Sequence, residues 1–320
     1  MAEINHADIV RFAADRVNLP ADKAQQHRDQ VNRLRDRLEK KIKEEPDYAL
    51  VKMLHAGSVA KGTALRTVND LDAAVYVRAN AAPAGYGNLV PWLADRLFEA
   101  NPNMERAQFE EQPHCVTVNF RGTGLDVDMV PVLYEGGADD RGYLVNQDTG
   151  ARMLTSITLH LRFIRDRKKK YGQPYAELIR LTKWWKRQVL AQNPDFKFKS
   201  FMAELIWAHL ADRGLDLSDY PAALEGFYEH ILKGEFAELV AFTDFVGFAD
   251  LPPRGDSPIA IIDPVNVENN VASQYTTTDR SRLVATAQNA FDALCEARFA
   301  STKGRAVDCW QAVLGPSFKV

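Results

Sequence analysis

Apolar residues recur every three to four positions along several long stretches of the chain, the spacing that predicts amphipathic helices. Residues 21–45 show it clearly, because Val31, Leu34, Leu38 and Ile42 form one stripe among charged side chains. Pro46 follows and ends the predicted helix, since proline cannot continue one. A shorter helix is predicted before it, over residues 6–17, with Asn5 as its N-cap.

Strictly alternating apolar positions predict strands between the first helices and residue 150. The predicted strands are residues 49–55, 71–77, 115–120 and 125–133, with a helix over residues 92–100 between the second and the third. The segment Arg121-Gly-Thr-Gly124 predicts a tight turn joining the last two strands.

After residue 150 the pattern becomes helical. The predicted helices are residues 151–170, 174–191, 200–212, 220–233 and 279–300. Strands first and helices later indicate an α+β fold, with a catalytic core over residues 1–150 and a helical nucleotide-binding lobe over residues 151–320.

Composition sets limits on the class of protein. The chain has 320 residues, 46% of them hydrophobic, and a formal net charge of −3, so it has no overall attraction to polyanions. No apolar run is long enough to span a membrane, and the first residues do not resemble a signal peptide. The cysteines, at positions 115, 295 and 309, are far apart and indicate neither a zinc site nor disulfides. We therefore expect a cytoplasmic protein that makes no membrane contact.

The first candidate functional residues along the chain are Gly57 and Ser58, followed by Asp70 and Asp72. Residues two apart on a strand point to the same side, so these two carboxylates should share a small volume and repel each other unless a cation lies between them. A glycine-serine turn can offer backbone N–H groups and a hydroxyl to phosphate. Asp-x-Asp alone is a weak signal, but a second acidic pair, Asp126 and Asp128, lies on another apolar strand.

Carboxylates on such apolar strands are costly to bury without a partner. Mg²⁺ prefers hard oxygen ligands, and two such ions can activate an attacking hydroxyl and stabilise a leaving oxygen. We therefore expect a site for two Mg²⁺ ions, with Mn²⁺ as a substitute, at these carboxylates.

The order of these motifs carries a family resemblance. The string G-S-x-x-x-G-T from Gly57, then D-x-D at Asp70, then D-x-V-P at Asp128, resembles the polymerase-β-like nucleotidyltransferases. Within that superfamily the chain is most similar to the branch of oligoadenylate synthases, cyclic GMP-AMP synthase and the bacterial cGAS/DncV-like nucleotidyltransferases (CD-NTases). Three segments carry this closer likeness: residues 178–186, 199–205 and 262–272. Val267 departs from the branch, where a second proline is common.

The resemblance implies a two-lobed fold in which a small mixed sheet carries the carboxylates and the helix over residues 21–45 braces both lobes. It assigns the donor phosphates to Gly57 and Ser58 and both metals to Asp70 and Asp72. The third carboxylate should be Asp128, which precedes the Val-Pro pair; Asp126 on the same face is the rival.

Two further residues are assigned to the nucleotide by the resemblance, Lys183 and Ser200. Lys183 is two positions from Trp185 and so points away from the predicted buried stripe, which suits either a lysine facing a cleft or an exposed one. Ser200 begins a predicted helix, where it could bind an anion, act as a simple N-cap, or both. The resemblance favours the nucleotide in both cases.

Residues 162–170 are the densest basic run. Nucleic-acid binding is one interpretation, and a solvated helix end is the favoured one. Because no zinc-ligand cluster interrupts this region, activation by double-stranded DNA is not expected.

The activity implied by the resemblance is Mg²⁺-dependent joining of nucleoside triphosphates, ATP with GTP or another, into a cyclic di- or trinucleotide. A purine product such as cyclic GMP-AMP is expected, acting as a second messenger in anti-phage signalling, with an effector that binds the product rather than this chain. Addition of nucleotides to RNA or to a protein hydroxyl is the alternative enzyme, and an inactive nucleotide-binding module is the alternative without catalysis.

Overall fold

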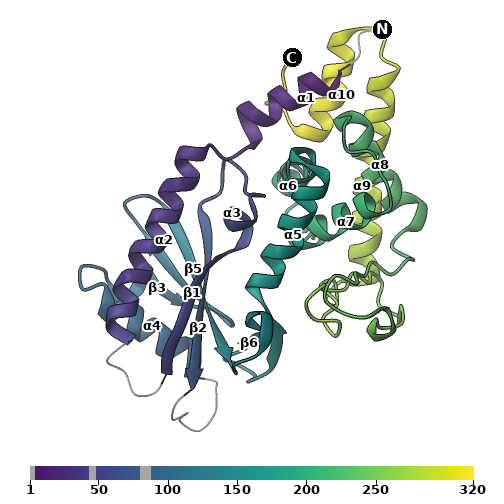
Figure 1. Ribbon diagram of the computed structural model, residues 1–320. Helices are drawn as coiled ribbons and strands as arrows, with labels where there is room; N and C mark the ends of the chain where they lie inside the picture. Colours follow the sequence, from purple (N-terminus) through teal and green to yellow (C-terminus); the bar gives the residue numbers. More distant parts are fainter. Residues whose placement is uncertain (1–3, 43–47, 80–87) are drawn as a thin grey trace. The chain divides into compact units, whose positions relative to one another are not determined.

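The computed structural model describes residues 4–42, 48–79 and 88–320 (Figure 1). Spatial contacts divide the chain into two compact units. One is Leu19–Ile164, here called the sheet unit; the other, the helical unit, combines the N-terminal segment through Asn18 with Arg165–Val320.

This division differs from the predicted boundary after residue 150. Arg152–Thr155 form a strand, β7, which pairs with β6 of the sheet. The sheet unit therefore extends beyond residue 150. The first predicted helix belongs to the helical unit, because its elements pack against helices α6 and α8 there.

The sheet unit is built around seven strands of the described residues, in the order β1-β2-β5-β4-β3, with β6 beside β5 and β7 beside β6. β2 and β5 are parallel, and the other pairs are antiparallel. The strands are β1 Tyr48–Ala56, β2 Asp70–Ala79, β3 Phe109–Glu111, β4 Val116–Phe120, β5 Leu125–Tyr134, β6 Gly142–Val145 and β7 Arg152–Thr155. The four predicted strands are confirmed as β1, β2, β4 and β5, and the predicted small mixed sheet with them.

Helices α2, Ala21–Ile42, and α4, Leu89–Ala100, pack on this unit. The predicted stripe on α2 is buried in one hydrophobic cluster with side chains that alternate along β2. The cluster members contributed by α2 and β2 are Val31, Leu34, Leu38, Ile42, Leu71, Ala73, Val75 and Val77. Because side chains alternate on a strand, Asp70 and Asp72 fall on the opposite face of β2. The end predicted for α2 beyond residue 42 lies outside the described residues.

The helical unit carries most of the remaining helices (Figure 1). They are α1 His6–Phe12, continued by a π-helical turn Ala13–Val17, then α6 Gln173–Gln192, α7 Ser200–Asp212, α8 Tyr220–Gly234, α9 Thr277–Arg298 and α10 Lys303–Leu314. α10 was not predicted. Short 3₁₀ turns occupy Arg106–Gln108 and Ala138–Asp140 in the sheet unit and Phe248–Asp250 in the helical unit.

Helix α5, Ile157–Tyr171, begins in the sheet unit and ends in the helical unit. The helix predicted from residue 151 is wrong over its first residues, because β7 precedes α5. Ser156 sets the true start, since its hydroxyl accepts a hydrogen bond of 3.1 Å from the backbone N–H of Leu159. Within the described part of the chain, the helices are all too short or too polar to cross a bilayer.

Candidate active site

The acidic pairs of β2 and β5 lie side by side across two parallel strands. In the register, Asp70 stands opposite Asp126 and Asp72 opposite Asp128. Neighbouring strands are about 4.8 Å apart, so carboxylates on the same face of both are close together. The residues between them, Leu71 and Val127, point into the hydrophobic cluster instead. The register thus places the three predicted carboxylates and their rival Asp126 on one face of the sheet.

Burial and the repulsion between neighbouring carboxylates both act on this face. Burial raises the pKa of Asp128, the nearby charges of Asp70 and Asp126 raise it further, and a hydrogen bond from Thr117 acts in the opposite direction. Burial, together with Asp128 and then Asp72, also raises the pKa of the Cys115 thiol to about 12. The charges of neighbouring carboxylates contribute to both shifts, and a bound cation would reduce this repulsion.

The glycine-serine segment lies directly against these carboxylates. Instead of the predicted turn, Gly57–Lys61 form a single helical turn, α3, immediately after β1. Gly57 has a φ of +63°, and a Cβ on it would overlap the carboxylate of Asp72. Gly62 ends the turn in the left-handed region, and the backbone N–H of Thr63 donates to the Ser58 carbonyl at 2.9 Å. The structure therefore brings Gly57, at the start of α3, next to Asp72.

The donor set suits a divalent metal in its chemistry. Asp70, Asp72 and Asp128 supply hard oxygen ligands on two adjacent strands, and their mutual repulsion favours a cation. In the side-chain conformations of the described residues, no three acidic, cysteine or histidine groups already converge as a metal-binding cluster. The type of ligand atom, the strand register and the negative charge of these residues all suit a divalent metal ion. Binding of the ion would also have to bring the three carboxylates closer together.

Of the two environments that the sequence left open for Lys183, the structure excludes an exposed side chain. Lys183 is buried on α6, with 6% of its side chain exposed, and its ammonium group donates to Glu204 of α7 at 2.6 Å. The predicted stripe accounted for one face of α6, whereas the helix packs against α7, α8 and α10 and is buried from Tyr175 to Trp185 on nearly every side. The lysine is therefore buried, and its ammonium group is paired with Glu204.

Sequence reasoning missed Lys186, one turn further along α6. Its ammonium group lies 3.3 Å from the Ser200 hydroxyl, and both residues are half-buried. Ser200 is the first residue of α7 as predicted, but it is not the N-cap, which is Lys199. The structure thus pairs Ser200 with Lys186, and Lys183 with Glu204. A signal was present in the sequence, since both lysines fall within the segment that carries the resemblance.

The third resembling segment forms a loop closed by its own side chains. Asp263 accepts from the backbone N–H of Val265 at 2.9 Å and from the Asn269 amide at 3.1 Å. Asn270 accepts from the backbone N–H of Ile261 at 3.1 Å. These bonds explain why aspartate and asparagine recur in the segment: they satisfy backbone groups in an irregular loop.

That loop also holds the start of α7. The Lys199 ammonium group donates to the carbonyl of Val271 at 3.0 Å, and the Lys199 backbone N–H donates to the Tyr275 hydroxyl at 2.9 Å. Because Lys199 precedes Ser200, the loop fixes the position of that serine.

Part of the basic run on α5 forms ion pairs within the protein. Arg167 is buried and its guanidinium donates to Asp212 at 3.1 Å and to Asp244 at 2.8 Å. Lys169 and Lys170 are exposed. The favoured interpretation, a solvated helix end, holds for these two lysines and not for Arg167.

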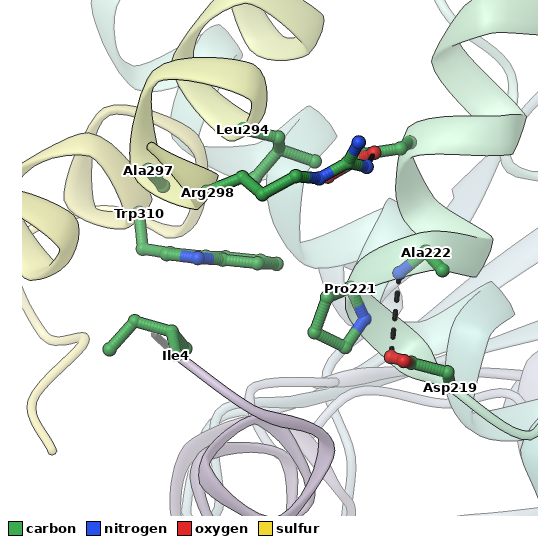
Figure 2. A pocket seen from close by; sticks show the side chains of 9 residues that line it. Ile4, Asp219, Pro221, Ala222, Leu294, Ala297, Arg298 and Trp310 are labelled. Atoms are coloured by element: carbon green, nitrogen blue, oxygen red, sulfur yellow. Dashed lines mark hydrogen bonds and ion pairs between the residues drawn. The ribbon is translucent and has the colours of Figure 1, made fainter. Parts of the chain in front are cut away.

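A pocket of the helical unit lies apart from the predicted site residues. Figure 2 shows it between the start of α8, the end of α9 and Trp310 of α10. Its charged groups have structural partners: Arg298 forms an ion pair with Glu225, and Asp219 accepts from the backbone N–H of Ala222 at 3.5 Å as the N-cap of α8. None of the predicted site residues lines it.

Comparison with solved structures first shows the fold. Vibrio cholerae DncV, a cyclic AMP-GMP synthase, superposes with a TM-score of 0.74 over 99% of this chain and 97% of its own, at 12% sequence identity. The chain therefore has the fold of these nucleotidyltransferases, as predicted. No model of a known protein family matches it.

Closer relatives then define the family. A cyclic AMP-AMP-AMP synthase of Escherichia coli strain MS 115-1 is 45% identical over 316 residues, 99% of this chain and 98% of the relative. The CBASS oligonucleotide cyclase CdnC of E. coli strain KTE188 is 30% identical over 99% of this chain and 98% of its own length. Structures of E. coli MS115-1 CdnC with ATP and in a complex with HORMA-deltaN each give a TM-score of 0.91 at 44% identity, over 99% of both chains.

The chain belongs to the bacterial CD-NTases, the family of the CBASS oligonucleotide cyclases. It is a nucleotidyltransferase that synthesises a cyclic oligonucleotide, the first of the activities predicted from the sequence.

Proposed function

We propose that this enzyme joins three molecules of ATP into cyclic AMP-AMP-AMP. The observation that carries the proposal is the 45% identity, over nearly the whole of both chains, to a synthase of that product. This proposal replaces the mixed purine product and the GTP substrate expected from the sequence with an adenine-only reaction. ATP bound to the E. coli MS115-1 CdnC structure further supports it.

Each transfer would follow the same chemistry. A ribose hydroxyl of one nucleotide loses its proton to water as its oxygen forms a bond to the α-phosphorus of another; the bond from that phosphorus to the bridging oxygen breaks, and pyrophosphate leaves with the electron pair. Two transfers produce a linear chain, and a third closes the ring, so three pyrophosphates are released per product. The enzyme contributes mainly by positioning the reactants and by neutralising charge.

The proposed metal ligands are Asp70, Asp72 and Asp128. A pair of Mg²⁺ ions, or Mn²⁺ in their place, would lower the barrier by polarising the attacking hydroxyl and stabilising the leaving oxygen. Gly57 and Ser58 would contact the donor phosphates, because they begin α3 and Gly57 lies directly against Asp72.

In the helical unit we propose that Ser200 and Lys186 contact the triphosphate. Their contact with each other supports this assignment, which places a cation and a hydroxyl at the first turn of α7. Lys183, to which the resemblance gave this role, already neutralises Glu204.

We further propose that the enzyme acts in antiviral defence and binds a HORMA-domain protein. The name of the 30% identical relative, a CBASS oligonucleotide cyclase, supports the first assignment, and the complex formed by E. coli MS115-1 CdnC supports the second. An effector would bind the cyclic product rather than this chain.

One experiment tests the proposed activity. The purified protein is incubated with ATP, GTP, CTP or UTP singly and with all four together, in Mg²⁺ or Mn²⁺, with and without its HORMA partner; phosphatase then removes terminal phosphates. Mass spectrometry should find a phosphatase-resistant cyclic trimer of AMP from ATP alone. A product that needs GTP, or incorporation only into added RNA or protein, would refute the proposal. Asp70→Asn should release no pyrophosphate under any of these conditions.

A further inference from the structure

Thr117 on β4 contacts the third carboxylate of the site. β4 runs antiparallel to β5, and the register places Thr117 opposite Asp128 and Asn119 opposite Asp126. The Thr117 hydroxyl donates to Oδ1 of Asp128 at 2.7 Å. This distance is typical of a strong hydrogen bond between a hydroxyl and a carboxylate. The side chain of Asp126 makes no hydrogen bond to any residue in the described ranges.

The surroundings of Thr117 restrict its side chain. Val116 and Val118, its neighbours on β4, are fully buried and fix the strand against the hydrophobic cluster. Threonine is branched at Cβ, which restricts rotation about χ1. A restricted hydroxyl that donates to one carboxylate oxygen also restricts the rotation of that carboxylate.

We propose that Thr117 is a positioning residue that orients Asp128 for metal binding. Its hydroxyl engages Oδ1 and leaves Oδ2 available to a divalent cation, so Asp128 rather than Asp126 is prepared as the third ligand. Groups that hold a metal ligand by hydrogen bonding typically change metal affinity or activity by about 10- to 100-fold when they are removed. This inference rests on the proposed role of Asp128 in the metal site.

The test compares four proteins: the full-length enzyme, Thr117→Val, Thr117→Ser and Thr123→Val. Thr117→Val removes the hydroxyl and keeps the shape, and Thr117→Ser keeps the hydroxyl. Thr123 is a matched control, because it is exposed at the turn of the same hairpin and its hydroxyl faces the carbonyl of Phe120. Mn²⁺ affinity is measured by electron paramagnetic resonance with a non-hydrolysable ATP analogue bound, and the rate of pyrophosphate release from ATP is measured separately.

We expect Thr117→Val to weaken Mn²⁺ binding and to slow turnover by about 10-fold or more. Thr117→Ser should retain most of both properties, and Thr123→Val should match the unmodified enzyme. Mn²⁺ affinity of Thr117→Val equal to that of the enzyme, or an equal loss in Thr117→Ser, would overturn the inference. Should Thr117→Val fail to fold, as judged by thermal unfolding, Thr117→Ala removes the same hydroxyl without adding bulk and gives the same comparison.

Asp128→Asn separates this inference from the function on which it rests. If Asp128→Asn still releases pyrophosphate, the proposed metal site is wrong. If Asp128→Asn is inactive while Thr117→Val behaves like the unmodified enzyme, only the positioning role of Thr117 is wrong.

Discussion

Gly57 and Asp72 approach so closely that a Cβ on residue 57 would lie 1.6 Å from Oδ2 of Asp72. Real Cβ atoms do not approach other atoms this closely, so any side chain at this position must displace the carboxylate or α3. Gly57 also has a φ of +63°, a region that is strained for other residues. The glycine is therefore required for both the backbone conformation and the space beside Asp72.

We predict that Gly57→Ala loses turnover by about 100-fold, the effect expected when a reacting group is displaced by roughly 1 Å. Gly124→Ala is a matched control, because Gly124 has the same φ of +63° and open space around the added Cβ. Both variants should lose about 1 kcal/mol of stability from backbone strain. Rates of pyrophosphate release and thermal unfolding of both proteins check this, and equal loss of turnover in the two would contradict it.

The two acidic residues of β5 should separate in function. We predict that Asp128→Asn abolishes pyrophosphate release and that Asp126→Asn retains it, since Thr117 orients Asp128. The charge of Asp126 raises the pKa of Asp128, so its removal should lower that pKa. The acid limb of the pH-rate profile of Asp126→Asn should therefore move to lower pH. An unmoved profile, or an inactive Asp126→Asn, would show that the two roles are assigned wrongly.

The carboxylate site could be predicted from sequence because strand alternation determines it. Once β2 and β5 are recognised, residues two apart must share a face, and Asp70 and Asp72 follow without knowledge of the tertiary structure. Their alignment with Asp126 and Asp128 depends on a parallel register between strands far apart in the chain. The family resemblance implied that alignment, and local sequence pattern cannot reveal it.

Other features depend on tertiary packing and were predicted wrongly or missed. Lys183 was expected away from the buried face, but α6 is enclosed by several helices, so its polar positions need buried partners such as Glu204. Arg152–Thr155 were predicted as helix because their four residues carry little pattern of their own; pairing with β6 makes them a strand. Both errors arise where neighbours in space override local preference.

Acidification should destabilise the enzyme through His209 on α7. Its ring lies 5.4 Å from that of His230 on α8, and burial, then the charges of His230 and Arg213, lower the pKa of His209 to about 4. The unfolded chain, in which the histidine has its ordinary pKa of 6.5, binds more protons between these values, so stability rises with pH across this window.

We predict that His209→Gln reduces the loss of stability on lowering the pH from 6.5 to 4. Urea unfolding at several pH values measures it, as the difference in slope between the variant and the unmodified enzyme. Above pH 7 the free energies of unfolding of the two proteins should change with pH in parallel, because His209 is then neutral in both the folded and the unfolded state. Identical slopes below pH 6.5 would contradict the prediction.

Replacing either of the two lysines of α6 should affect the enzyme, but in different ways: one replacement should reduce stability and the other should weaken ATP binding. Lys183→Met leaves Glu204 buried without its ion-pair partner, which typically costs about 3–5 kcal/mol in stability. Replacing both, as Lys183→Met with Glu204→Leu, should recover most of that loss, because both charges of this ion pair are then removed. Chemical denaturation of the single and double variants measures this coupling.

Lys186→Met should behave differently, because Lys186 is half-buried and contacts the hydroxyl of Ser200. We predict a raised KM for ATP with little change in the free energy of unfolding, whereas the doubly substituted protein that lacks Lys183 and Glu204 should bind ATP normally. Isothermal titration with a non-hydrolysable ATP analogue compares the two directly. If the double variant folds but no longer binds the analogue, and Lys186→Met still does, then Lys183 contacts the triphosphate and its ion pair with Glu204 must open when the nucleotide binds.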